Sequence, residues 1–170
     1  MVLIVTPLSR LPQVIRARGP SHLLTLLSPE DLIPTPPGFA PARHLRLGMD
    51  DISAPMAGLI APDAAMVEEI LAFGRSWDAS APMVIHCFAG NSRSTASAFV
   101  IACERDPRAD ELEIALGMRR ASPSAFPNRR IVALADDILG RQGRMLEAVE
   151  AMGGNGFVIE GVPFDIPVRR

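Results

Sequence analysis

The sequence predicts an α/β fold with a central, mostly parallel sheet of four to five strands flanked by helices. Short apolar runs alternate along the chain with segments in which apolar residues recur at helical spacing, and this alternation is typical of strands connected by helices. The run over residues 22–27 is apolar on both faces, as in a strand whose sheet is covered on both sides. The length of 170 residues suits one domain, 1–170, with a sizeable core.

The first half of the chain contains three predicted strands before its central motif. Apolar runs define the first two strands, whereas apolar and polar residues alternate in the third. Pro12 begins a short helix that Gly19 closes, and Asp63 is a suitable cap for a longer helix. The predicted elements are strands at 2–5, 22–27 and 44–49, helices at 11–18 and from 64 onward, and a Pro-rich loop at 28–41.

The second half of the chain is predicted to be mainly helical. A buried helix follows the central motif, and Asp110 caps the next helix. One long apolar stripe then extends over residues 131–152, in which Gly140 and Gly143 kink or split the helix. The tail, residues 155–170, has apolar residues among Gly and Pro. It is either an extended segment docked on the domain or a contact for another chain.

The stretch over residues 83–95 carries the strongest functional signal. It begins as an apolar strand, passes through a loop of small and polar residues, and continues into a helix. Helix N-termini carry unpaired N–H groups and partial positive charge, so a loop that curls into one suits a phosphate. Gly90 permits backbone angles that a side chain forbids, and Arg93 can grip two oxygens of one phosphoryl group. The same donors would stabilise a Cys87 thiolate, placed for in-line attack on phosphorus.

The pattern His86-Cys87-x5-Arg93-Ser94 resembles the signature of the cysteine-based protein tyrosine phosphatase superfamily, and by length its small dual-specificity-like, bacterial-type members. The resemblance implies a phosphotyrosine protein phosphatase II-like fold and no cofactor. It also implies that Cys87 forms a phosphocysteine and that Arg93 binds substrate and stabilises the transition state. Ser94 would help the thiolate leave, and His86 would belong to the hydrogen-bond network around it. The implied phosphate-binding loop consists of His86, Phe88, Ala89, Gly90, Asn91, Ser92 and Arg93.

A pair of acidic residues lies at the position where this family keeps its general acid. The family carries an Asp on a mobile loop some thirty to forty residues before the Cys, and it protonates the leaving oxygen. Asp51 lies 36 residues before Cys87 and Asp50 lies 37 before it. Tyrosine-specific members have Trp-Pro-Asp there. In this sequence Met49-Asp50 replaces the Trp-Pro of that motif, but Pro55 follows Asp51 at the family's spacing. Asp51 is therefore preferred as the acid, and Asp50 is the second choice.

Asn128 is a second point of resemblance. Small dual-specificity phosphatases often open a helix with Pro-Asn, and the Asn supports the rim of the active site. Asn128 is equally a good helix cap by itself, so both interpretations stay open. Nearby arginines would attract an anionic substrate or, as is commoner for such residues, be solvated surface charges; they are Arg119, Arg120, Arg129 and Arg130.

Composition and charge argue against several classes of partner. The formal net charge of −2 offers no basic footprint for nucleic acid, and no apolar run reaches the length of a membrane span. Residues 1–5 lack a basic leader and are interpreted as a strand, not as a signal peptide. The three histidines show no metal-ligand spacing. Cys87 and Cys103 make no disulfide framework, and a catalytic thiol needs a reducing compartment, so a cytoplasmic location is expected.

The leading functional hypothesis is a phosphomonoester hydrolase that acts through a phosphocysteine intermediate with an Asp general acid. The loop between Cys87 and Arg93 carries no charged side chain. This favours a phosphorylated protein or a small phosphomonoester over highly phosphorylated lipids or inositols, with phosphate, sulfate or another oxyanion in the loop. Two alternatives remain: a catalytically idle, phosphate-binding pseudophosphatase, and a rhodanese-like sulfurtransferase, which also places a Cys in an anion-binding loop.

Overall fold

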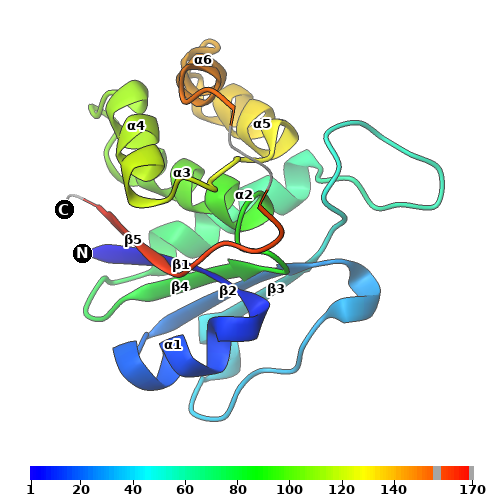
Figure 1. The fold of residues 1–170 in the computed structure, drawn as a ribbon, viewed down its shortest axis with the longest axis vertical. Coiled ribbons are helices and arrows are strands. Elements are labelled where there is room, and N and C mark those ends of the chain that lie inside the picture. The colour runs from blue at the N-terminus through cyan, green and yellow to red at the C-terminus, as the bar shows by residue number, and fades with distance from the viewer. Residues whose placement is uncertain (155–157, 169–170) are drawn as a thin grey trace.

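A computed structural model of the chain describes residues 1–154 and 158–168 as one sheet between two layers of helices (Figure 1). The sheet has five strands in the order β3-β2-β4-β1-β5. All neighbouring strands are parallel except β5, which is antiparallel to β1. The predicted α/β fold with a mostly parallel sheet is therefore confirmed. The strands are β1 (Val2–Pro7), β2 (His22–Leu27), β3 (His44–Gly48), β4 (Met83–Cys87) and β5 (Phe164–Pro167).

The two faces of the sheet are covered unequally, as Figure 1 shows. On one face, helix α1 (Leu11–Arg18) packs Leu11 and Val14 against a small cluster of sheet residues. The other face carries the larger core and five helices. Because both faces are covered, all residues of β2 and β4 are buried. The five helices are α2 (Ala64–Ser76), α3 (Arg93–Arg105), α4 (Glu111–Ala121), α5 (Arg129–Leu139) and α6 (Arg144–Ala151).

Local signals set most of the element boundaries. The predicted helix 11–18 and strand 22–27 have these bounds in the structure. The carboxylates of Asp63 and Asp110 cap α2 and α4 by accepting from the N–H groups of Met66 and Leu112. The Pro-rich loop 28–41 contains the short 3-10 turn η2 (Pro29–Asp31) and leads into η3 (Pro41–Arg43); η1 (Leu8–Arg10) precedes α1.

The long apolar stripe over residues 131–152 is split into two helices. Gly140 ends α5 in the left-handed conformation with φ 63°, and Gly143, with φ 88°, precedes α6. The buried Asp136 carboxylate stabilises this break because it accepts from the N–H groups of Gly143 and Met145 at 2.6 and 2.9 Å. The split that the sequence left open as one alternative is thus the one that forms.

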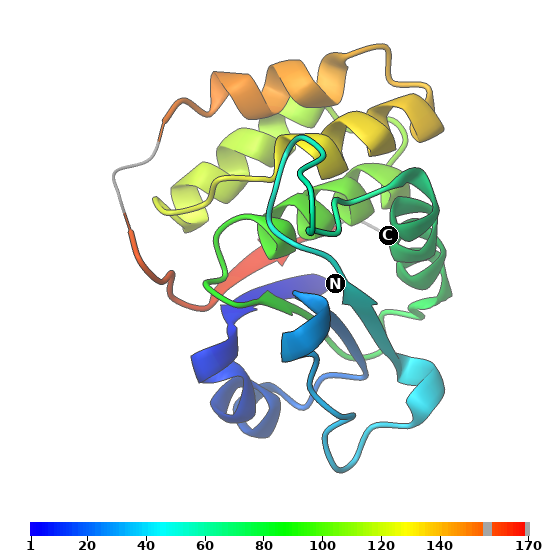
Figure 2. The same ribbon diagram turned by 90° about the vertical axis from the view of Figure 1, so that its right-hand side faces the viewer.

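The C-terminal part of the chain returns to the sheet. Of the predicted tail 155–170, residues 155–157 and 169–170 lie outside the described residues. Residues 158–163 pass beside the loop that follows β4, as Figure 2 shows, and β5 then pairs with β1 at the sheet edge. The side chain of Arg18 pairs with Asp165 on this edge at 2.9 Å. Within residues 1–154 and 158–168 no helix combines the length and the apolar character that a membrane crossing requires.

A buried ion pair joins α4 to the turn between α5 and α6. The Arg141 guanidinium donates to the Glu111 carboxylate at 2.8 Å, and both side chains are 8% exposed. Arg141 also donates to the carbonyl of Cys103 at 2.7 Å. The Arg141 side chain therefore links helices α3 and α4 to the turn between α5 and α6.

Replacing Glu111 by Ala is expected to lower the free energy of unfolding by about 3–5 kcal/mol, because the Arg141 charge stays buried without its partner. Urea unfolding of both proteins measures the difference. As a control, Arg75→Ala removes the more exposed pair with Glu104 and should cost less than about 1 kcal/mol. Equal losses in the two variants would contradict this account of the buried pair.

Candidate phosphate-binding site

The loop over residues 88–92 joins the end of the central strand β4 to the start of the central helix α3. Cys87 is the last residue of β4 and Arg93 is the first residue of α3. Parallel α/β sheets present such loops at the carboxyl ends of their strands, where ligands bind. Residues 93–103 of α3 are all buried, so the helix that follows the loop is held firmly in the core.

The backbone of the loop turns its carbonyl groups toward the surrounding protein. The Phe88 carbonyl accepts from Leu8 N–H and the Ala89 carbonyl from Gly161 N–H, at 3.0 and 2.9 Å. The carbonyls of Asn91 and Ser92 accept from the N–H groups of residues 126 and 128, at 2.7 and 3.2 Å. In contrast, none of the N–H groups of residues 88–92 has a partner in the described parts of the chain. The loop thus leaves its donors available to an anion.

Gly90 is required at the centre of this loop for two reasons. Its φ of +72° lies in the left-handed region that glycine adopts without strain. A Cβ atom at this position would also lie 2.7 Å from the backbone nitrogen of Pro7 at the end of β1. The close approach of loop to strand therefore excludes any side chain at position 90. The sequence predicted a glycine there for its backbone angles alone.

Cys87 lies at the base of the loop with 2% of its surface exposed. Its Sγ is 3.1 Å from the Oγ of the buried Ser94, a distance at which a hydroxyl can donate to a thiolate. The second cysteine, Cys103, lies on α3, and burial raises the pKa of its thiol to about 12. Because the thiolate is the reactive form, this environment makes Cys103 inert at neutral pH.

The Arg93 side chain is buried beside the loop and only partly paired. It is 6% exposed, and its Nη1 donates to the Met49 carbonyl at the end of β3, at 2.8 Å. Its Nε is buried and has no hydrogen-bond partner among the residues that the structure describes. A buried unpaired donor on a charged group is costly. An anion in the loop would supply the missing acceptor.

A chain of buried polar side chains supports the strand that carries Cys87. His86 Nδ1 is 3.3 Å from the Cys87 carbonyl oxygen, and its Nε2 is 2.7 Å from Thr25 Oγ1. Thr25 Oγ1 is in turn 2.8 Å from His44 Nε2, and His44 Nδ1 is 2.9 Å from Thr35 Oγ1. Desolvation by burial is the main cause that lowers the pKa of each imidazole to about 4, so both rings are neutral at pH 7.

The direction of every hydrogen bond in this histidine–threonine chain follows from its last acceptor. A carbonyl can only accept, so the proton of the neutral His86 ring is on Nδ1 and its Nε2 accepts from Thr25. Thr25 Oγ1 then accepts from the Nε2–H of His44, and the Nδ1 of His44 accepts from the Thr35 hydroxyl. Sequence reasoning missed Thr25 and His44. The available signal was a single polar residue inside an otherwise apolar strand, which must find a buried partner.

The structure brings Asp51, and not Asp50, to the loop. The exposed Asp51 accepts through Oδ1 from Ser92 Oγ at 2.7 Å and from Asn128 Nδ2 at 2.9 Å. Asp50 instead accepts from Ser28 Oγ and from Ile60 N–H. The bond from Ser28 is the main cause that lowers the pKa of the Asp50 carboxyl. Asp50 therefore closes the base of the loop 50–60, which Figure 2 shows in teal near the start of α5.

Asn128 caps α5, as one of the two interpretations expected, and it also bonds to the loop that carries Asp51. Its Oδ1 caps α5 by accepting from the N–H groups of Arg130 and Ile131, and its Nδ2 donates to Asp51 and to the Ile52 carbonyl. One side chain thus fixes both α5 and the acidic loop against the phosphate loop. The arginines nearby have protein partners: Arg119 and Arg130 donate to backbone carbonyls, and Arg129 pairs with Glu150.

Comparison with known proteins identifies the fold. No protein-family model matches the sequence, and a search of curated proteins found no match. Solved structures of dual-specificity phosphatases, which belong to the cysteine-based protein tyrosine phosphatase superfamily, do match, so this chain has their fold. The structure of human DUSP28 is similar with a TM-score of 0.60 and 21% sequence identity, over 82% of this chain and 92% of that one.

Two further structures give the same result. DUSP15 is similar with a TM-score of 0.60 and 17% identity, over 91% of this chain and 94% of that one. PTPMT1, solved in complex with PI(5)P, has a TM-score of 0.58 and 13% identity, over 88% of this chain and 91% of that one. At these identities the similarity establishes the fold, and the chemistry has to be argued from the residues of this chain.

The neutral histidine at the base of the loop predicts a pH dependence of stability. Between about pH 6.5 and pH 4 the unfolded chain protonates its histidines, whereas folded His86 stays neutral. The unfolded state binds more protons, so lowering the pH in this window costs about 1.4 kcal/mol of unfolding free energy per pH unit for His86. Urea unfolding of wild type and His86→Asn across this window should give a shallower slope for the variant. Equal slopes would show that His86 titrates normally in the folded protein.

Proposed function

We propose that the protein is a protein tyrosine phosphatase-type phosphomonoester hydrolase. The observation that carries the proposal is the buried Nε of Arg93 beside the amides of the loop, since within residues 1–154 and 158–168 neither that Nε nor these amides have a hydrogen-bond partner. Cys87 lies at the base of the same loop. A phosphoryl group supplies acceptors for several donors at once and places its phosphorus above the Cys87 sulfur. The shared fold of the dual-specificity phosphatases supports this assignment.

In the first step the Cys87 thiolate attacks phosphorus, and an S–P bond forms as the ester P–O bond breaks. The loop N–H groups and the Arg93 guanidinium hold the equatorial oxygens, where negative charge develops. Asp51 gives its proton to the leaving oxygen, so that an alcohol and not an alkoxide departs. Ser92 and Asn128 both bond to Oδ1 of Asp51, which leaves Oδ2 to carry that proton.

In the second step water hydrolyses the phosphocysteine. The Asp51 carboxylate accepts a proton from the water, whose oxygen bonds to phosphorus as the S–P bond breaks. The Ser94 hydroxyl, 3.1 Å from Cys87 Sγ, donates a hydrogen bond to the departing thiolate. Inorganic phosphate leaves and the enzyme returns to its starting state, so the cycle needs no metal and no external reductant.

The substrate class follows from the charge of the site. No side chain between Cys87 and Arg93 is charged, so the loop offers one cationic group, suited to one phosphate. We therefore assign a phosphorylated protein or a small phosphomonoester as substrate, and phosphate, sulfate or tungstate as inhibitory oxyanions. A reduced nucleophilic thiol suits a reducing compartment such as the cytoplasm.

Cys87→Ser is expected to abolish hydrolysis of p-nitrophenyl phosphate, because a hydroxyl without an adjacent base is a far weaker nucleophile than a thiolate. The variant should still bind tungstate, since the loop donors and Arg93 are unchanged; isothermal calorimetry measures this. Phosphate transfer to the wild-type protein can be trapped by acid quench and detected by mass spectrometry. Turnover by the variant, or a wild-type protein that binds tungstate without forming phosphocysteine, would refute the hydrolase assignment.

The two neighbouring aspartates allow a matched test of the general acid. Asp51→Asn should lower kcat about 10²–10⁴-fold, most strongly for alkyl phosphates, whose leaving groups need a proton. Asp50→Asn keeps an acceptor for Ser28 but loses the acceptor for Ile60 N–H; because it removes no proton donor from the site, its kcat should fall less than that of Asp51→Asn. Steady-state kinetics with phenyl and alkyl phosphates distinguish the variants. A larger loss in the Asp50 variant would reverse the assignment of the acid.

A further inference from the structure

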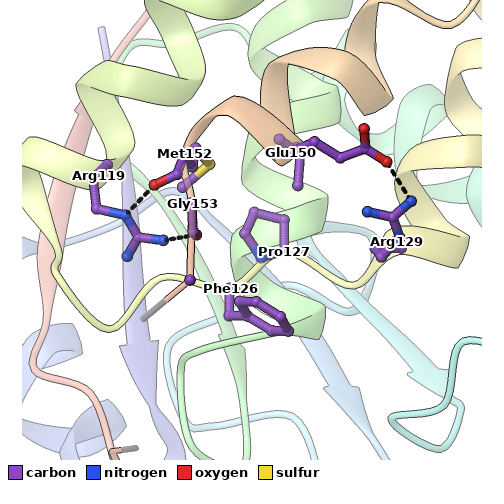
Figure 3. A pocket seen from close by; sticks show the side chains of 9 residues that line it. Arg119, Phe126, Pro127, Arg129, Glu150, Met152 and Gly153 are labelled. Carbon is purple, nitrogen blue, oxygen red and sulfur yellow. Dashed lines mark hydrogen bonds and ion pairs between the residues drawn. The ribbon is translucent and has the colours of Figure 1, made fainter. Parts of the chain in front are cut away.

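A second cavity lies beside the phosphate loop, between the segment 122–128 and helix α6 (Figure 3). Its volume is about 220 Å³ and its lining is mainly apolar. Figure 3 shows Phe126 and Pro127 on one side and the end of α6 on the other. This cavity plays no part in the two chemical steps proposed above. Its apolar walls are formed by Phe126, Pro127, Val149 and Met152.

The cavity and the phosphate loop share one wall. The N–H of Phe126 donates to the carbonyl of Asn91 in the phosphate loop at 2.7 Å. Two residues later, Asn128 holds Asp51 and donates its N–H to the Ser92 carbonyl. Because this wall is bonded directly to the phosphate loop, the cavity lies on the side of the loop where residues that flank a phosphorylated side chain would pass.

The charged groups around the cavity are already engaged, which decides the kind of ligand it takes. The Arg119 guanidinium donates to the carbonyls of Pro123, Met152 and Gly153. The Arg129 guanidinium pairs with Glu150 at 2.5 Å. Both guanidinium groups thus already bond to the protein, and Glu150 balances the charge of Arg129, whereas the Phe126 ring is half-exposed at the wall. The cavity thus matches a neutral, apolar group.

Its size matches one side chain. Pockets for drug-sized molecules occupy about 300–1,000 Å³, more than the 220 Å³ available here. A phosphorylated lipid is less well matched, because its headgroup and bilayer would favour unpaired cations at the rim and both arginines of the cavity are paired. A residue of a phosphoprotein fits both the volume of the cavity and the pairing of its charged groups.

We propose that this cavity is a specificity subsite that binds a large apolar side chain, such as Leu, Met or Phe, close to the phosphorylated residue of a protein substrate. The proposal rests on the proposed hydrolase function and adds to it the sequence preference of the enzyme. Binding there covers the exposed Phe126 ring and removes apolar surface of both partners from water.

The test uses phosphotyrosine peptides of equal length. In each set a single position, between four residues before and four residues after the phosphotyrosine, carries Leu, Phe, Ala or Glu. For the wild-type protein, kcat/KM should be at least about tenfold higher with Leu or Phe than with Ala at one of these positions. Glu should give no gain. p-Nitrophenyl phosphate, which is too small to reach the cavity, reports basal activity.

Val149→Phe fills the cavity from α6 and should remove the preference while p-nitrophenyl phosphate turnover stays within about twofold. Ile138→Phe is the matched control, because Ile138 is an exposed residue on α5 outside the cavity lining; it should keep the preference. Two results would overturn the subsite and leave the hydrolase function intact, provided that p-nitrophenyl phosphate turnover is normal. One is a wild-type protein without peptide preference, and the other is an unchanged preference in Val149→Phe.

Two other outcomes separate the subsite from the function on which it rests. Failure to hydrolyse both p-nitrophenyl phosphate and every peptide would refute the hydrolase function, and the subsite with it. Turnover of p-nitrophenyl phosphate and of phosphatidylinositol 5-phosphate in phosphatidylcholine vesicles, without turnover of any peptide, would refute the subsite and the assigned substrate class but leave the hydrolase chemistry intact, because the substrate would then be a lipid.

Discussion

The structure of the site depends on one property of the loop between β4 and α3: in the part of the chain that the structure describes, most of its carbonyl groups are paired with the protein and its N–H groups are not. Within the described residues, four N–H groups from three segments outside the loop and α3 pair with the carbonyls of this loop, whereas no acceptor pairs with its amides. An unpaired buried donor costs about 1–3 kcal/mol, and the fold bears such a cost at Arg93 Nε. The buried strands, the histidine–threonine chain and Asn128 all hold the loop in the one arrangement that keeps its donors free for an anion.

The fold and the centre of the site could be predicted from the sequence because their signals are local. Pro and Gly delimit α1, an apolar run defines β2, and one acidic residue caps each of α2 and α4. The residues from Cys87 to Ser94 are contiguous, so a strand, a loop and a helix are sufficient to assemble them. Their spacing therefore carried most of the information about the kind of site.

The remainder of the site depends on pairings that no local pattern encodes. Thr25 lies opposite His86 in one strand pair and opposite Arg46 in the other, so the histidine–threonine chain exists only once three strands are in register. The choice between Asp50 and Asp51 is of the same kind. The two side chains are adjacent in sequence, but Ser28 and Ile60 bind one while Ser92 and Asn128 bind the other. Sequence spacing alone favoured Asp51 over Asp50 as the general acid, but it could not show which partners hold each side chain.

The bond from Gly161 to the Ala89 carbonyl has a consequence for how the molecule matures. Residues 89 and 161 are far apart in the chain, and a Cβ at position 161 would lie 2.5 Å from Oδ1 of Asn91, so a side chain there would force the Asn91 side chain to move. During ribosomal synthesis the strands and α3 can assemble while this region is still untranslated. One side of the loop then lacks its brace until residues 158–168 emerge and β5 docks, a closure of high sequence separation that comes late in folding. A nascent chain thus contains the strand, the loop and the helix of the site before it contains the segment that completes both the core and the contacts of the loop.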